Sequence, residues 1–362
     1  MAGTTTTTRR LGAATGSAAV LAFTVAGCGG SGSTASQRAA SGGFLATYAR
    51  ADGQVVRTDQ GGDTVSEGQA YGMLIAEASG DDGEFRTIWD WTRHYLQLSD
   101  GLFAWHASAG GQVIGQQPAS DADLLIAWAL LRYSGPDAAA MHGAGRKVAT
   151  AILAHEVTRG PGGVPVLTAG PWATGRPASL DPSYWSLPAM QGIAALTGVR
   201  EWQRLLDGAV TMTRSLTGDG RTLPPDWAAL TSSGALHPEP APSGSEPQTQ
   251  YGPDAQRTVA WFAISCDSAA RTLAASWWPL LRPAGHTDAL ALQPNGKVLS
   301  PAPAVLPMVA SAAAAKAAGD GAATSHLLQR AAAQQRRSPT YYGGAWDALG
   351  QELLASGTFA SC

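Results

Sequence analysis

The chain has 362 residues, of which 44% are hydrophobic, so it can bury a sizeable core in one large domain or two smaller ones. Only 14% of the residues are charged, compared with ~25% in an average soluble protein, and the formal net charge is −3 with no basic stripe. This balance argues against a nucleic-acid partner and favours a soluble globular protein that acts on an uncharged molecule.

The first 28 residues have the pattern of an export signal. Arg9 and Arg10 precede an apolar stretch, residues 11–26, that is shorter than the ~20 residues needed to span a bilayer. The stretch runs into Val-Ala-Gly-Cys, which resembles a bacterial lipobox with Cys28 as the lipid-modified first residue of the mature chain. The alternative is an ordinary signal peptide in which Cys28 is incidental. The pattern therefore predicts an exported protein, either anchored to the membrane by lipid or secreted, and the arginine pair also suggests twin-arginine export.

Residues 29–43 are rich in Gly and Ser and predict a flexible tether, so we expect a single folded domain over residues 44–362. In this domain apolar residues recur three and four positions apart, as in helices, in nine segments: 71–78, 85–98, 122–131, 145–155, 187–196, 202–216, 258–273, 304–318 and 345–354. The best candidate for a strand is residues 164–168. No loop marks a domain boundary, because helical patterns continue on both sides of each one. The pattern predicts one all-α body of paired helices.

Two cysteines remain beyond the signal. Cys266 lies in an apolar run and Cys362 is the last residue. Export permits a disulfide between them; the alternative is one buried thiol and one at a frayed end. Neither the cysteines nor the seven histidines have the spacing of metal ligands, so the sequence predicts no metal site.

Three acidic residues, Glu67, Asp121 and Asp254, are expected in the first turns of three apolar helices. Each accompanies a helix-start signal: a capping-box pattern or a proline at the first helical position (Ser66 with Gln69, Ser120 with Asp123, and Pro253). Taken singly, such an acid is explained by its favourable interaction with the helix dipole, worth a few tenths to ~1 kcal/mol. The three helices are apolar on more than one face, so we expect them in an interior layer. If they run parallel there, the three acids converge at one end of the body.

Two stretches carry the most specific motifs, SEGQAYGM at residues 66–73 and ASDAD at residues 119–123. They resemble motifs of glycoside hydrolase family 8, formerly cellulase family D. Four further motifs follow in the family's order: GLFAWH at 101–106, LPPDW at 223–227, DAQR at 254–257 and YY at 341–342. The resemblance covers residues 44–359. The chain departs from the family at Thr-Val-Ala-Trp, residues 258–261, where the family often has Pro and aromatics, and in two loops without counterpart, 160–175 and 231–252.

The resemblance implies an (α/α)₆ barrel of six inner and six outer helices, which binds substrate across the inner N-terminal ends and cleaves β-1,4-linked glycans with inversion. It makes Glu67 the general acid, Asp254 the general base and Asp121 the residue that holds the distorted sugar. Arg257, one turn after Asp254, would orient or charge the base. Inversion requires the acid and base carboxyl groups to lie ~6.5–9.5 Å apart, with room for water. Because a helix N-terminus favours an ionised Glu67, burial and the charge of Asp121 are expected to raise its pKa.

Aromatic side chains stack on the apolar faces of sugar rings, and we expect Trp105, Tyr184, Trp185 and Tyr342 to bind substrate in this way. Tyr341 is a close alternative to Tyr342. Most other tryptophans lie in helical runs and are expected in the core: Trp89, Trp91, Trp128, Trp261, Trp277, Trp278 and Trp346.

The function that we expect is that of an inverting endo-β-1,4-glucanase, a monomer at the cell surface that needs no metal or other cofactor. Xylan or xylo-oligosaccharides are the next substrates, and a surface lipoprotein that binds glycans without cutting them is the alternative from another class. Polycationic chitosan is disfavoured because the mildly acidic chain has few acids to spare.

Overall fold

Twelve α-helices in the described part of the chain form two concentric rings. The computed structural model describes residues 1–3, 35–244 and 247–359, and all twelve helices belong to the unit formed by residues 33–362. The inner ring consists of α2 (Ser66–Ser79), α4 (Ser120–Arg132), α6 (Leu187–Thr197), α8 (Pro253–Ala263), α10 (Val305–Ala317) and α12 (Tyr341–Gln351). The outer ring consists of α1 (Ala35–Tyr48), α3 (Asp82–Tyr95), α5 (Ala138–His155), α7 (Glu201–Leu216), α9 (Ser268–Leu281) and α11 (Gly321–Arg337).

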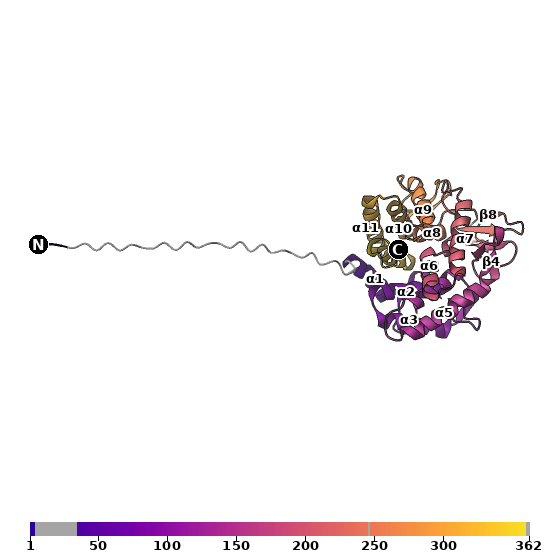
Figure 1. The fold of residues 1–362 in the computed structure, drawn as a ribbon, viewed down its shortest axis with the longest axis horizontal. Helices are drawn as coiled ribbons and strands as arrows, with labels where there is room; N and C mark the ends of the chain where they lie inside the picture. The colour runs from indigo at the N-terminus through magenta and orange to yellow at the C-terminus, as the bar shows by residue number, and fades with distance from the viewer. Residues whose placement is uncertain (4–34, 245–246, 360–362) are drawn as a thin grey trace. The chain divides into compact units, whose positions relative to one another are not determined.

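The helix contacts establish an (α/α)₆ barrel. Each inner helix contacts the next inner helix along the chain, and α12 contacts α2, which closes the ring. The outer helices pack on inner neighbours, for example α5 on α4 and α11 on α10 and α12. The chain therefore passes once around the body, as the colour gradient from α1 to α11 shows (Figure 1). This arrangement confirms the expected fold class.

The two rings differ in burial because the inner helices touch neighbours on all sides. Every residue from Ser120 to Leu131 in α4, and from Val305 to Ala315 in α10, is buried. Small residues allow this close approach: a Cβ at Gly192 of α6 would lie 2.4 Å from Nε1 of Trp128. In contrast, α3 and α7 bury one stripe and expose the other, as expected for a surface layer.

Nine helical segments were expected and twelve helices are present among the described residues. The segment 258–273 spans the end of α8 and the start of α9, which are separated by a turn where Asp267 caps α9 through the Ala270 N–H (2.8 Å). Helix α11 was missed because polar residues and alanines obscure its apolar stripe.

Helix α1 was also missed, and it occupies part of the expected tether. It begins at Ala35, so residues 35–43 are helical and belong to the same unit as the barrel, whereas the domain was expected to begin at residue 44. Ser41 donates a hydrogen bond to Glu352 (3.2 Å), and the ring of Phe44 lies 6.0 Å from that of Tyr341. These contacts attach α1 to the last inner helix and to the turn that follows it. Residues 29–34 lie outside the described residues.

Short antiparallel strands precede the inner helices. They form four sheets: β1 (Thr64–Val65), β2 (Ala104–Ala107) and β3 (Val113–Pro118); β4 (Val157–Arg159) and β5 (Pro165–Leu167); β6 (Ala178–Leu180), β7 (Trp227–Leu230) and β8 (Leu236–Glu239); β9 (Ala289–Leu292) and β10 (Val298–Pro303). Strand β5 confirms the candidate at 164–168. Strands β1, β3 and β10 end next to the first residues of α2, α4 and α10, so they decorate the barrel end where these helices begin.

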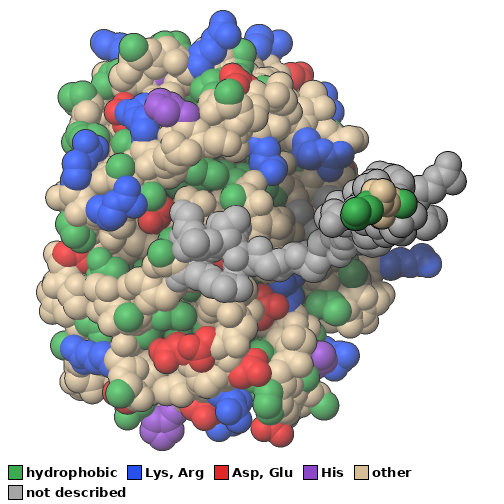
Figure 2. Space-filling model, turned by 90° about the vertical axis from the view of Figure 1, so that its left-hand side faces the viewer, with side chains coloured by type: hydrophobic (Ala, Val, Ile, Leu, Met, Phe, Trp, Pro, Cys, Tyr) green, Lys and Arg blue, Asp and Glu red, His purple; other side chains and the backbone are tan. Residues whose placement is uncertain are grey.

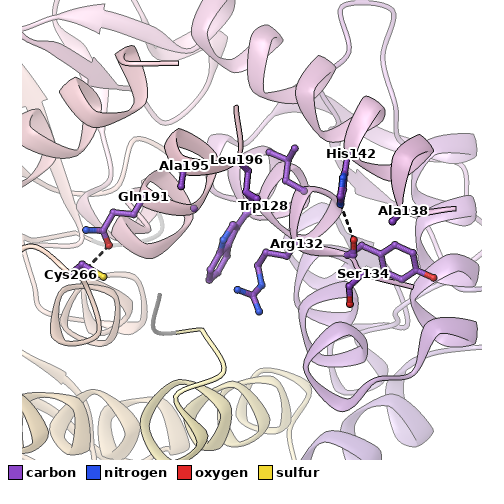
Figure 3. A pocket seen from close by; sticks show the side chains of 12 residues that line it. Trp128, Arg132, Ser134, Ala138, His142, Gln191, Ala195, Leu196 and Cys266 are labelled. Carbon is purple, nitrogen blue, oxygen red and sulfur yellow. Dashed lines mark hydrogen bonds between the residues drawn. The ribbon is translucent and has the colours of Figure 1, made fainter. Parts of the chain in front are cut away.

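An apolar pocket lies at the other ends of α4 and α6 (Figure 3). Trp128, Arg132 and Gln191 line it, and the Phe359 ring lies 5.3 Å from that of Trp128. Cys266, which also lines this pocket, is disulfide-bonded, and its partner lies outside the described residues. None of the helices in the described part of the chain is long and apolar enough to cross a membrane.

Candidate active site

Glu67, Asp121 and Asp254 are each the second residue of an inner helix, as expected, but the helix starts are not built as the capping patterns predicted. The N-cap residues are Val65, Ala119 and Gly252, none of which caps through a side chain. The expected capping residues make tertiary contacts instead: Gln69 accepts the Val55 N–H (2.6 Å) and donates to Thr92 (2.8 Å), Ser120 donates to the Thr168 carbonyl (2.5 Å), and Asp123 accepts the Phe103 N–H (2.9 Å). The capping-box interpretation is therefore wrong, because these buried side chains satisfy groups of neighbouring segments.

Arg257 of α8 brings the three acids together. Its Nη1 pairs with Glu67 and, at 3.0 Å, with Oδ2 of Asp121. Its Nη2 pairs with Oδ1 of Asp254 at 2.9 Å and also donates to the hydroxyl of Ser183 (2.7 Å). The guanidinium is 3% exposed, so these charge-assisted contacts form in a largely dry environment, where they are strong. The three helix starts thus converge, as the interior-layer hypothesis predicted.

The exposure of the acids separates them into two kinds. The side chains of Glu67 and Asp254 are 20% and 30% exposed, whereas that of Asp121 is 8% exposed. The side chains of the first two are therefore more accessible to solvent, and hence to a bound molecule, than that of Asp121. Each pairs with a different nitrogen of Arg257, so the guanidinium stands between them.

Glu67 combines an accessible carboxyl group with a raised pKa. Burial raises the pKa of Glu67 from its ordinary 4.5 to about 7; the Arg257 charge opposes this rise, and the charge of Asp121 adds to it. The Tyr71 hydroxyl donates to Glu67 at 2.8 Å, which favours the charged form and is also outweighed. Glu67 can therefore hold a proton near neutral pH, the property that a general acid needs. The expected causes, burial and Asp121, are both present.

Sequence reasoning missed a fourth acid, Asp181. Its side chain is fully buried, its Oδ1 accepts the Ser183 N–H (2.8 Å), and its Oδ2 lies 3.8 Å from Nη2 of Arg257. Burial raises the pKa of Asp181 well above its ordinary range, and the charge of Asp254 adds to the effect, against the opposing charge of Arg257. Burial likewise raises the pKa of Asp121. A single guanidinium thus faces four carboxyl groups, which favours retention of protons on some of them.

Two tyrosines face the acidic cluster. The Arg257 guanidinium lies 5.3 Å from the centre of the Tyr184 ring. Burial raises the pKa of the Tyr342 hydroxyl well above its ordinary value; Arg257 opposes this and the charge of Glu67 adds to it, which places this phenol beside the acids. Tyr341 is instead buried against Phe44 and Tyr48. The Tyr341 hydroxyl nevertheless lies against Gly68, the residue after Glu67, and burial and the charge of Glu67 raise the pKa of Tyr341, so both tyrosines of the pair adjoin the acids and only Tyr342 is partly exposed.

The tryptophans divide between surface and core. Trp105 on β2 is 39% exposed, and its neighbour His106 pairs with Val65, the residue before α2, so Trp105 lies near the start of that helix. Trp185 is fully buried and donates its indole N–H to the Leu167 carbonyl (2.8 Å). Trp185 therefore cannot stack on a sugar, and its assignment to substrate binding is wrong.

One exposed tryptophan was overlooked. Trp172 is 47% exposed and its indole N–H donates to the carbonyl of Pro118 (3.1 Å), three residues before Asp121. It lies in the loop 160–175, after β5, in a short turn (Pro171–Ala173). Nothing in the sequence distinguishes it from a tryptophan that is exposed elsewhere.

On the face that Figure 2 shows, charged side chains do not gather into one continuous patch. On the face shown in Figure 2, Lys and Arg side chains are scattered among uncharged surface. The described residues contain no group of three or more His, Cys, Asp or Glu side chains arranged to hold a metal ion. The site therefore offers paired carboxyl groups, one guanidinium and aromatic rings.

A sequence profile of glycosyl hydrolases family 8 matches residues 29–353. A probable endoglucanase of Novacetimonas hansenii is 34% identical over 231 residues, 60% of this chain and 64% of the relative. An endoglucanase of Cellulomonas uda is 30% identical over 200 residues, 54% of this chain and 56% of the relative. A reducing-end xylose-releasing exo-oligoxylanase of Paenibacillus barcinonensis is 32% identical over 125 residues, 32% and 33% of the two chains. The chain thus spans less than two thirds of the length of these relatives.

Solved structures match over more of their length. The endo-β-1,4-glucanase CMCax from Acetobacter xylinum has a TM-score of 0.71 and 26% identity, with 90% of this chain and all of that chain covered. An endo-β-1,4-glucanase from an Achatina fulica gut metagenomic library has a TM-score of 0.70 and 26% identity, with 87% and 96% covered. The helical barrel is therefore shared with solved proteins almost from end to end.

Proposed function

The chain belongs to glycosyl hydrolase family 8, and on that premise we propose that it is a glycosidase that cleaves internal β-1,4 bonds of glucan with inversion of configuration. The observation that carries the proposal is the pairing of Glu67 and Asp254 with opposite nitrogens of Arg257, with the pKa of Glu67 raised to about 7. A carboxyl group that can hold a proton and a second, accessible carboxyl group are the parts that an inverting glycosidase requires.

In the proposed reaction, Glu67 gives its proton to the glycosidic oxygen as the bond to the anomeric carbon breaks. Asp254 accepts a proton from a water molecule as that water attacks the opposite face of the sugar. The leaving sugar keeps the proton of Glu67, and the anomeric carbon gains the hydroxyl of the water. Exchange with solvent then returns a proton to Glu67 and removes one from Asp254. The 30% exposure of Asp254 is consistent with contact with this water.

Asp121 supplies negative charge beneath the reacting sugar. An oxocarbenium-like transition state carries positive charge on the ring, and a fixed carboxylate stabilises it. Arg257 contacts Asp121 at 3.0 Å and Asp254 at 2.9 Å, so it holds both side chains in place, and its charge opposes the rise in the pKa of Asp121 that burial causes.

The substrate is proposed to be β-1,4-glucan, because two of the relatives are named endoglucanases and two similar structures are endo-β-1,4-glucanases. Xylo-oligosaccharides are the second candidate, favoured by the similarity to the exo-oligoxylanase. Exposed Trp105, together with Tyr184 and Tyr342 at the acids, supplies rings for stacking on either sugar.

We also propose that the chain is exported and held at the cell surface by lipid on Cys28. Cys28 and the arginine pair lie among residues 4–34, outside the described residues, so the support is the sequence pattern alone. Replacement of Cys28 by Ser in the full chain should move the protein from the membrane fraction to the medium. An unchanged distribution would contradict the lipid anchor without affecting the proposed reaction.

The reaction is tested by release of reducing ends from carboxymethyl cellulose, barley β-glucan, xylan and chitosan by the wild type and by Glu67→Gln. We expect activity on the first two, loss of at least ~10³-fold in the variant, and an inverted anomer as the first product in a proton NMR time course. Activity on xylan alone would support the second candidate. A wild type inactive on all four polymers would favour a glycan-binding protein, and a retained anomer would contradict inversion.

A further inference from the structure

Asp226 is the fourth residue of the LPPDW motif, which the proposed reaction does not use. The side chain is 1% exposed and accepts three hydrogen bonds. Its Oδ1 accepts the backbone N–H groups of Gly252 (2.8 Å) and Ala255 (2.7 Å), and its Oδ2 accepts the side-chain amide of Gln250 (3.0 Å). The three donors belong to the segment that leads into α8 and to the first turn of that helix, which carries Asp254 and Arg257.

The contacts replace a local helix cap. The N-cap residue of α8 is Gly252, which has no side chain to accept from the first turn, and Pro253 has no N–H. An N-cap side chain normally accepts the N–H two or three residues later. Asp226 does this for Ala255 from a segment 29 positions earlier, and it also binds the N–H of the N-cap residue itself. The first turn of α8 is therefore held by the residue that immediately precedes β7.

Strand β7, which follows Asp226, pairs with the strand that precedes Ser183, a residue that contacts Arg257. Trp227 begins β7, which pairs with β6 in the register Leu180 to Ala228. The residues after β6 include Ser183, which accepts from Nη2 of Arg257. The Asp226 backbone N–H also donates to the Gln250 carbonyl at 2.9 Å. Asp226 thus ties the start of α8 to the loop that faces it across the guanidinium.

Gly252 packs directly against the carboxylate of Asp226. A Cβ added at Gly252 would lie 2.4 Å from Oδ2 of Asp226 and 2.6 Å from Nε2 of Gln250. The φ angle of Gly252 is −114°, so the close approach, and not the backbone conformation, requires glycine at this position. The Asp226 carboxylate can occupy this position because Gly252 has no side chain.

We propose that Asp226 is a positioning residue for the hydrolytic reaction: through its hydrogen bonds to Gly252 and Ala255 it sets the place of Asp254 relative to Glu67. The inference rests on the proposed function. A misplacement of ~1 Å can cost about 100-fold in rate, and Asp254 is the residue immediately before Ala255. Asp226 itself acts on the substrate only through α8.

The test compares three variants in the full chain. Asp226→Ala removes all three hydrogen bonds. Asp226→Asn keeps Oδ1 as acceptor for both backbone N–H groups, and the Gln250 amide can turn to accept from the new Nδ2. Gly252→Ala keeps the Asp226 carboxylate, but the added methyl group displaces the carboxylate from its hydrogen-bond donors. Asp320→Ala is the control, because Asp320 caps the outer helix α11 through the Ala323 N–H (3.0 Å).

The readouts are kcat and KM on a soluble cello-oligosaccharide and the Tm of each variant, with rates measured well below every Tm. We expect Asp226→Ala and Gly252→Ala to lose about 10- to 100-fold in kcat with KM within about threefold. Asp226→Asn should keep kcat within about fivefold of the wild type, and Asp320→Ala should lower Tm alone. The double variant Asp226→Ala with Gly252→Ala should be no slower than Asp226→Ala, because the clash is gone.

Several results would overturn the inference. A lowered Tm with unchanged kcat in Asp226→Ala would assign Asp226 a structural role like that of Asp320. Equal losses of kcat in the Asn and Ala variants would exclude positioning through Oδ1. If the Asp226→Ala variant does not fold, an unchanged kcat in the Gly252→Ala variant would by itself overturn the inference. A wild type that cleaves no glycan defeats the proposed function first, and with it the premise of the inference.

Discussion

The raised pKa of Glu67 makes the stability of the protein depend on pH in a way that needs no substrate to measure. The carboxyl group titrates near 4.5 in the unfolded chain and near 7 in the folded one. Between these values the folded state holds a proton that the unfolded state has lost, so stability falls as pH rises through this window and levels off above it. Each pKa unit is worth ~1.4 kcal/mol, so the whole effect is about 3 kcal/mol.

Glu67→Gln removes this dependence, because Gln resembles the protonated acid and does not titrate. We expect the variant to gain about 2–3 kcal/mol relative to the wild type when urea unfolding is moved from pH 5 to pH 8. Asp207→Asn, an exposed acid of α7 that makes a hydrogen bond to Gln203, is the matched control for loss of one carboxyl group. It should gain far less across the same interval.

A difference between wild type and Glu67→Gln that stays constant from pH 5 to pH 8 would refute the reasoning. Glu67 would then already be ionised at pH 5, and a carboxylate cannot protonate a leaving group. The same reasoning predicts that kcat declines as pH rises above about 7, since the fraction of protonated Glu67 falls there.

The other predictions concern single side chains. Arg257→Lys keeps the charge but cannot reach four carboxyl groups, so kcat should fall at least ~100-fold and Tm should fall as well, because contacts of a buried guanidinium are lost; a kcat within threefold of the wild type would contradict the role of the guanidinium. Trp105→Ala should raise KM about tenfold, as for loss of one sugar-stacking contact, with Tm unchanged; an unchanged KM on long oligosaccharides would remove Trp105 from the site. Trp185→Ala should lower the free energy of unfolding by about 3–5 kcal/mol, measured with urea; a loss below 1 kcal/mol would contradict its core position.

The positions of Glu67, Asp121 and Asp254 could be predicted because helix starts leave a local signal and the motifs resemble those of a family. Asp181 and Ser183 could not. They lie in a short irregular segment after β6, and their value comes only from the distance to Arg257, which is 74 residues later than Ser183. Contacts between segments so far apart leave no periodic trace in one sequence.

Adjacent aromatics illustrate the same limit. Tyr184 faces Arg257 while Trp185 points into the core, and they are neighbours in a turn that has neither the period of a helix nor that of a strand. The periodicity of a helix predicts which of two neighbouring residues is buried, whereas an irregular segment has no periodicity from which to predict it. The capping interpretation failed for a related reason. Gln69 and Asp123 are typical of helix caps when the sequence is read locally. In the folded chain their side-chain oxygens instead accept hydrogen bonds from the buried N–H groups of Val55 and Phe103.

The charge-poor composition and the properties of the site have a common physical cause. The inner helix α6 carries no charged residue, α12 carries only Asp347, and α10 only Lys316 in its last turn. The acids at the starts of α2, α4 and α8 therefore interact with Arg257 and with one another across low-dielectric surroundings that contain few competing charges. Burial, which is the largest cause of the raised pKa of Glu67, does not depend on salt, and buried pairs are screened little. The pH above which activity declines should therefore stay almost constant between low and physiological ionic strength, whereas a pKa set by distant surface charges would move.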